Sequence, residues 1–87
     1  MIHKVYSIYD SKAEVYTLPY FSKMEAEAIR YFSNWVNDPN HQFGKNPEDY
    51  TLFYIGEYDD NLGTFEQSHQ ESKGVGIQYI RNEESVQ

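Results

Sequence analysis

The hydrophobic and polar positions of the chain follow two periods, one typical of strands and one typical of a helix. Ile2 to Tyr9 and Glu14 to Leu18 are short runs rich in β-branched and aromatic residues, a composition that favours β-strands. Polar residues from Asp10 to Ala13 separate the two runs. Asp and Ser side chains bond to the nearby backbone in turns, so the pattern predicts an N-terminal β-hairpin.

A helical period begins after Pro19, which ends the second run. Apolar residues then recur at intervals of three and four, at Met24, Ala28, Ile29, Phe32, Trp35 and Val36. This spacing predicts an amphipathic helix from about Lys23 to Asn37, with Met24, Ala28, Ile29, Phe32 and Val36 buried against a sheet. Ser22 and Glu25 have the spacing of a capping box, which predicts Ser22 as the N-cap. Pro39 ends the helix because the residue before a proline avoids the α conformation.

The second half of the chain returns to strand patterns. Tyr50 to Tyr58 is apolar on both faces, which predicts a central strand, and Gly56 marks a bulge or close approach within it. The flanking segments are predicted to be a loop (40–45), one helical turn (46–49), a hairpin loop (59–63), the start of a return strand (64–66), a polar stretch without core residues (67–73) and a short last strand (75–81).

This order of elements predicts an α+β fold in a single domain, residues 1–81. We expect a small antiparallel sheet, β-β-α-β-β with a possible fifth strand, covered by one amphipathic helix. Residues 82–87 are expected to form a flexible polar tail.

Composition narrows the classes of protein that fit. The 87 residues carry a net charge of −7, no cysteine and 17% aromatic residues. Residues 1–45 are neutral, and all the excess negative charge lies in residues 46–87. An acidic chain repels nucleic-acid backbones, which argues against a sequence-independent DNA coat protein. No apolar run reaches membrane-spanning length and no signal peptide opens the chain, so we expect a soluble cytoplasmic protein that contacts no membrane.

No catalytic or metal-binding motif stands out. The three histidines, at positions 3, 41 and 69, lie in separate elements without metal-ligand spacing. The acidic residues of the 59–66 hairpin lack the register of a calcium loop and are ordinary turn residues. We therefore expect no metal, no cofactor and no enzymatic activity.

The aromatic residues are the more informative feature. Nine Tyr, five Phe and one Trp exceed what one helix over one sheet buries, and we expect partial exposure of Tyr16, Tyr20, Phe21, Tyr31, Tyr50 and Tyr54. Three interpretations remain open: rings packed with their hydroxyls at the rim, a protein interface, or stacking on single-stranded bases. The candidate residues for binding a partner or DNA are Tyr20, Phe21, Lys23, Arg30, Phe43 and Lys45.

A family resemblance runs over three stretches of the chain, Val5 to Phe21, Ala26 to Pro39 and Phe43 to Glu66. It is most specific in the segments YDSKAE, Ala28-Ile29-Arg30, Val36-Asn37-Asp38 and FGK followed by PEDYTLF. In these segments the chain resembles the small non-structural protein of gokushoviruses, which are single-stranded DNA bacteriophages of the Microviridae. The resemblance implies a role in phage DNA replication, at the switch to making single-stranded genomes for packaging, and a place in the host cytoplasm. It implies no catalytic residue and no place in the virion.

Two functions follow from these observations. The first is a non-enzymatic regulator of phage single-stranded DNA synthesis that binds the phage replication protein or a host replication factor through an aromatic surface. The second is a direct single-stranded DNA binder that uses aromatic and basic residues of the N-terminal half. We also expect a homo-oligomer, most simply a dimer, because so short a chain without disulfides has few other sources of stability, and its neutral N-terminal half, the hairpin and helix, suits a two-fold interface.

Overall fold

The computed structural model describes residues 1–81. Its elements in chain order are β1 (Ile2–Asp10), β2 (Val15–Tyr16), β3 (Tyr20–Ser22), α1 (Glu25–Val36), α2 (Gln42–Lys45), the 3-10 helix η1 (Pro47–Asp49), β4 (Tyr50–Asp59), β5 (Thr64–Val75) and the 3-10 helix η2 (Gly76–Tyr79). The strands form one antiparallel five-stranded sheet. The predicted α+β class, with an antiparallel sheet and one main helix, is confirmed.

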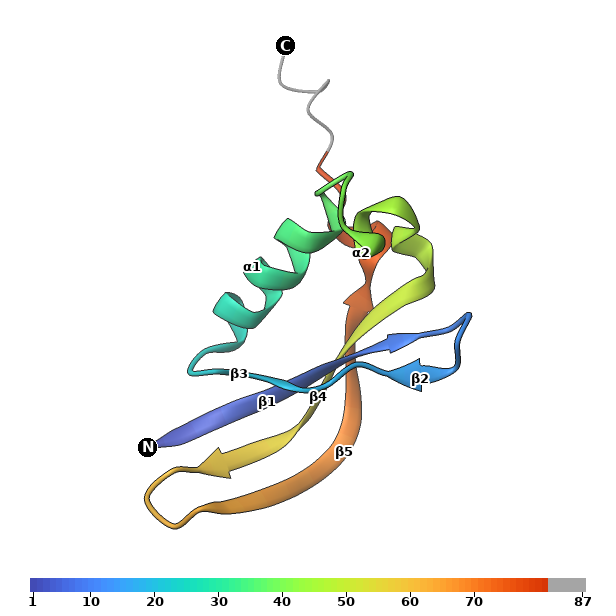
Figure 1. Cartoon of the computed structure of the whole chain (residues 1–87). Helices are drawn as coiled ribbons and strands as arrows, with labels where there is room; N and C mark the ends of the chain where they lie inside the picture. The colour runs from blue at the N-terminus through green and yellow to red at the C-terminus, as the bar shows by residue number, and fades with distance from the viewer. Residues whose placement is uncertain (82–87) are drawn as a thin grey trace.

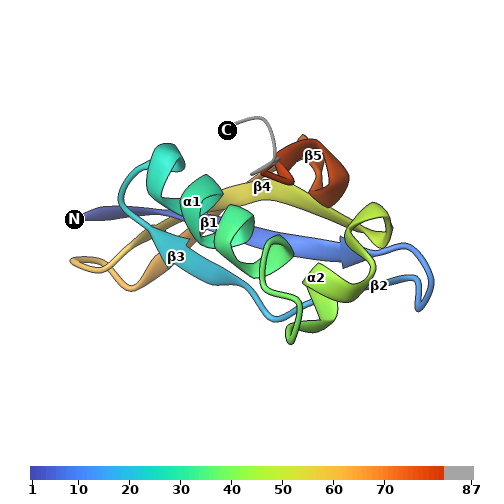
Figure 2. The ribbon, with the colours of Figure 1, turned by 90° about the horizontal axis from the view of Figure 1, so that it is seen from above.

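The long strands β1 and β4 form the middle of the sheet. The strand order is β2-β1-β4-β5, and β3 also pairs with β1, on the same side as β2. The sheet twists strongly, and α1 and α2 both lie on one side of it (Figures 1 and 2). The prediction that Tyr50 to Tyr58 forms a central strand is confirmed, because β4 pairs with β1 on one side and with β5 on the other.

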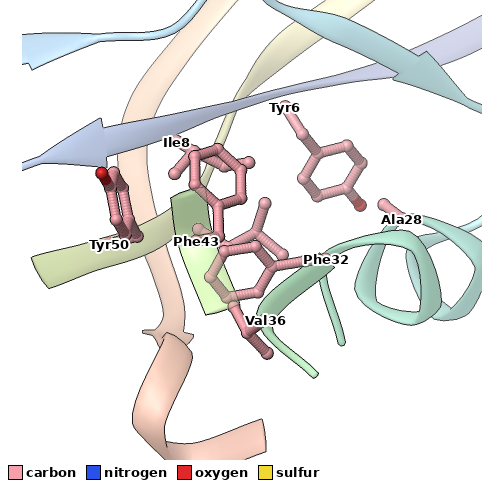
Figure 3. Packing of buried hydrophobic residues seen from close by; sticks show 8 residues of the cluster. Tyr6, Ile8, Ala28, Phe32, Val36, Phe43 and Tyr50 are labelled. Atoms are coloured by element: carbon pink, nitrogen blue, oxygen red, sulfur yellow. The ribbon is translucent and has the colours of Figure 1, made fainter. Parts of the chain in front are cut away.

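The core lies between α1 and the middle of the sheet (Figure 3). From the helix come Ala28, Phe32 and Val36, which are at most 1% exposed. They meet side chains of β1, β4 and the short helical turns, namely Tyr6, Ile8, Phe43, Tyr50 and Leu52. Rings dominate this contact: the Phe32 ring lies 6.2 Å from that of Phe43 and 5.7 Å from that of Tyr79, between centroids.

Two tyrosines, the buried Tyr6 and the partly buried Tyr20, place polar atoms at the edge of this core. The Tyr20 hydroxyl donates to the carbonyl of Ala28 at 2.9 Å, and the Tyr6 hydroxyl donates to the carboxylate of Glu25 at 3.3 Å. Burial raises the pKa of both tyrosines, because the phenolate form would lose its hydration. For Tyr6 the negative charge of Glu25 adds to this effect.

The predicted helix start is wrong at its cap. Met24, not Ser22, is the N-cap of α1, and no side chain caps the helix. Ser22 lies in β3, where the single proton of its hydroxyl has two acceptors within reach, the Met24 carbonyl at 2.7 Å and the Glu27 carboxylate at 2.9 Å. The chain needs Ser22 to pair with Lys4 of β1, so the helix begins later. Met24, expected in the core, is 63% exposed for the same reason.

Three further predictions differ in detail. The predicted second strand, 14–18, is shortened to β2, and an unpredicted strand, β3, follows Pro19, which has no amide to donate to β1. The 40–45 segment contains the single turn α2. The predicted last strand, 75–81, is instead the turn η2, since β5 runs through the polar stretch as one strand of twelve residues. The predicted tail, 82–87, lies outside the described residues.

Substitution of Phe32 by Ala tests the packing of α1. Phe32 is fully buried, and truncation of a buried Phe costs about 3–5 kcal/mol because a cavity remains. We expect the free energy of unfolding in denaturant to fall by this amount. Arg30→Ala, on the exposed side of the same helix, is the control and should change stability by less than about 0.5 kcal/mol. Equal effects of the two substitutions would contradict the assigned face.

Alkaline pH tests the buried tyrosines. Their pKa values are raised in the folded state, so the stability that Tyr6 and Tyr20 contribute is complete below the unfolded pKa of about 10 and is lost above it. The free energy of unfolding should therefore fall as the pH rises in that range, by at most about 1.4 kcal/mol per pH unit for each of the two tyrosines. Denaturation followed from about pH 9 to 12 measures the slope. Tyr20→Phe should reduce the slope of unfolding free energy against pH. A wild-type protein with no such slope would show that the two rings are solvated.

Candidate interaction surface

One face of the sheet is turned away from the helices. Directly paired residues of neighbouring strands project to the same side, and the register therefore identifies the side chains opposite α1. We call this surface the open face. It comprises His3, Val5, Ser7, Tyr9, Tyr16, Phe21, Thr51, Phe53, Tyr58, Phe65, Gln67, Ser72 and Val75.

An aromatic cluster occupies the end of the open face near the β4–β5 hairpin. The ring of Tyr58 lies 5.8 Å from that of Phe21 and 4.8 Å from that of Phe65, and the Phe21 and Phe65 rings are 6.2 Å apart. Phe21 is 46% and Phe65 66% exposed. Two phenylalanine rings from strands far apart in the chain are thus held together with much of their surface in water.

A second aromatic cluster lies at the other end of the open face. The Tyr16 ring packs 4.8 Å from Tyr9 and 5.7 Å from Phe53, and Tyr16 is 45% exposed. Its strand β2 has only two residues, which are held against β1 by the Asp10 turn, where the Asp10 carboxylate accepts from the amides of Lys12 and Ala13.

A shallow groove of about 310 Å³ separates the two clusters. Hydroxyl and amide side chains line much of it, among them Ser7, Thr17, Gln67, Ser68 and Gln70. The register of β4 with β5 shifts beside it, between Tyr54 and Gly56. Gly56 has φ +155° and a side chain there would meet the Glu66 carbonyl at 2.4 Å, so the predicted close approach at this glycine is confirmed.

The open face is electrically neutral. No Lys, Arg, Asp or Glu belongs to it within residues 1–81. The alternation of strands sends charged side chains to the helix side instead, where Lys4, Glu57 and Glu66 share one register row. On that side Lys73 pairs with Glu25 at 3.3 Å and Glu71 at 3.5 Å.

His3 lies at the rim of the open face. Its Nε2 is 2.7 Å from the Asp60 carboxylate, which also accepts from the N-terminal ammonium group at 2.7 Å. Both hydrogen bonds lower the pKa of Asp60, and the one from the N-terminal ammonium group has the larger effect. They tie the start of β1 to the β4–β5 turn and so fix the border of the surface.

The six candidate residues predicted from the sequence do not form one surface. Phe21 lies on the open face, and its neighbour Tyr20 points to the other side, under α1. Phe43 is 5% exposed and belongs to the core. The three basic candidates, Lys23, Arg30 and Lys45, are exposed but lie between β3 and α1, on α1 and at the end of α2.

The expected exposure of aromatic residues is confirmed in part. Tyr16, Phe21 and Tyr31 are exposed, but Tyr50 is only 7% exposed because α2 places Phe43 4.5 Å from its ring. Sequence reasoning missed Phe65, the most exposed ring of the open face. Its signal was present: Phe65 directly follows the 59–63 turn, in a strand with no other aromatic residue.

The residues 1–81 show neither a metal-binding group nor a membrane-spanning helix. No three His, Asp or Glu side chains converge there as metal ligands would. Within the same residues, no helix is long and apolar enough to cross a bilayer.

Comparison with known proteins identifies the family of the chain. No curated protein and no solved structure matches it. A family model does match, over residues 3–77, and its description names no enzymatic activity. The matched region covers β1 to β5, including every strand that builds the open face. The chain therefore belongs to the family described as Phage ORF5 protein.

Proposed function

We propose that this chain is a non-enzymatic, non-structural protein of gokushovirus-type phages. It acts in the host cytoplasm, in the synthesis of viral single-stranded DNA, through protein–protein contacts made by the open face. Its partner in that process is the phage replication protein or a host replication factor. The observation that carries the proposal is the neutral aromatic surface, with Phe21, Phe65 and Tyr16 each at least 45% exposed.

The composition of the open face favours a protein partner over DNA. Exposed aromatic residues together with few charged ones are typical of the centre of a protein interface. Proteins that stack single-stranded bases add a positively charged groove that follows the phosphates. Here the basic residues are elsewhere, and Lys73 is neutralised by two carboxylates. Direct DNA binding is therefore the weaker of the two functions.

Affinity capture from infected cells, with and without nuclease treatment, tests this function. We expect the phage replication protein or a host replication factor to be retained after nuclease, as identified by mass spectrometry. Phe65→Glu should abolish this capture because it places a charge within an apolar contact. Met24→Glu is the matched control: Met24 is 63% exposed but precedes α1 on the helix side, and its substitution should leave capture unchanged.

Binding of single-stranded DNA by the purified protein tests the alternative function. Binding to single-stranded DNA would weaken steeply with salt, in proportion to the phosphates neutralised. We expect no such binding by the purified protein at physiological salt. Loss of every captured protein upon nuclease treatment, together with salt-dependent DNA binding, would overturn the proposed function.

A further inference from the structure

We infer that the open face binds a second copy of this chain, so that two sheets pack face to face in a two-fold dimer. The inference rests on the proposed function, since it names the occupant of the surface to which that function assigns protein contacts. The second copy and the replication protein would then compete for the same face, so that the dimer and the replication complex are alternative states of the chain.

The edges of the sheet are poor sites for self-association. One edge consists of β2 and β3, of two and three residues, with Pro19 between them. The other edge, β5, is long, but its pairing with β4 is interrupted by two register shifts. Near its end, Gln78 accepts from the amide of Val75. Short, bulged and proline-interrupted edges resist pairing with another chain, which leaves the face rather than the edge for a partner.

The distribution of charge favours a second copy over a basic partner. Each chain has a net charge of −7, so two copies repel each other. They can associate only through surfaces that keep their acidic residues apart. The open face provides such a region, because its strands send their acidic side chains to the opposite side of the sheet. A basic partner would find no complementary acidic residue on this face, whereas a second copy needs none. Since a two-fold interface presents the same patch twice, the neutral face meets its own equivalent without like-charge repulsion.

The polar groups of the groove are self-complementary. An amide side chain carries both a donor and an acceptor, so Gln67 and Gln70 can bond to the same residues of a second copy. The groove lies between two aromatic clusters. A two-fold axis through it would bring one cluster of each copy towards a cluster of the other.

The size of the face approaches what a dimer interface needs. Strands of nine to twelve residues that rise about 3.3 Å per residue and lie about 4.8 Å apart give a sheet about 30 Å by 19 Å. This outline is on the order of 600 Å², and projecting rings add to it. Standard interfaces take about 800 Å² of accessible surface from each partner, so the face alone provides most of what is needed.

Sedimentation equilibrium of the full chain tests the inference, in about 0.15 M salt where repulsion between the copies is screened within about 8 Å. We expect a mass twice the 10.3 kDa of the chain. Phe65→Glu and Tyr16→Glu, one in each aromatic cluster, should each raise the dissociation constant at least tenfold. Met24→Glu should leave the dimer intact. Thermal unfolding of each variant shows whether it is folded. If one of the two glutamate variants does not fold, the other still tests the dimer.

Two outcomes would overturn the inference. One is a mass of 10.3 kDa up to about 100 μM, a concentration that would populate any dimer of micromolar affinity. The other is a dimer that both substitutions leave unchanged. A monomeric protein that still captures a replication protein through Phe65 would refute the dimer alone. A dimer that captures no replication protein would refute the proposed function alone.

Discussion

Burial of one helix face against β1 and β4 is the contact on which the rest of the structure depends. A helix of twelve residues is about 18 Å long, whereas nine-residue β1 extends about 30 Å. The helix therefore cannot cover even its own side of the sheet. The short turns α2 and η2 complete the cover by supplying Phe43 and Tyr79, whose rings both meet Phe32. All the covering elements lie on that one side, which is why Phe21, Phe65 and Tyr16 of the other side remain at least 45% exposed.

The same shortage of covering elements explains where the charges lie. A sheet with one packed face normally sends polar residues to its free face. Here Lys4 and Glu57 project to the helix side, beyond the end of α1, while Phe21 and Tyr58 occupy the free face. This inversion leaves apolar side chains exposed to water, which is unfavourable, and it does not stabilise the isolated fold. The inversion is explained if a binding partner covers the free face in the functional complex.

Local signals in the sequence were sufficient for the main helix and the central strands but not for the helix cap or the polar strand β5. The period of three and four identified α1 and its buried Ala28, Phe32 and Val36, since those residues need only a sheet to pack on. The cap failed because Ser22 had two possible roles, and pairing of β3 with β1, a contact between distant residues, decided between them. Polar β5 was missed as one continuous strand for the same reason: its pairing with β4, rather than its own residues, makes it a strand. The binding candidates were chosen as aromatic and basic residues of the N-terminal half, and strand alternation placed the adjacent Tyr20 and Phe21 on opposite sides of the sheet.

Stability and association are linked in a protein of this shape. A domain of 87 residues buries only about 60–65% of its unfolded surface and has a small margin of stability. Any partner that binds the folded chain alone adds to that margin by mass action. Closing the open face would remove Phe65 and Tyr16 from water and complete a second core between the two sheets, with packing of the kind found in β-sandwiches. The aromatic residues that the fold leaves exposed are then best understood as half of a core, which the chain acquires only in a complex.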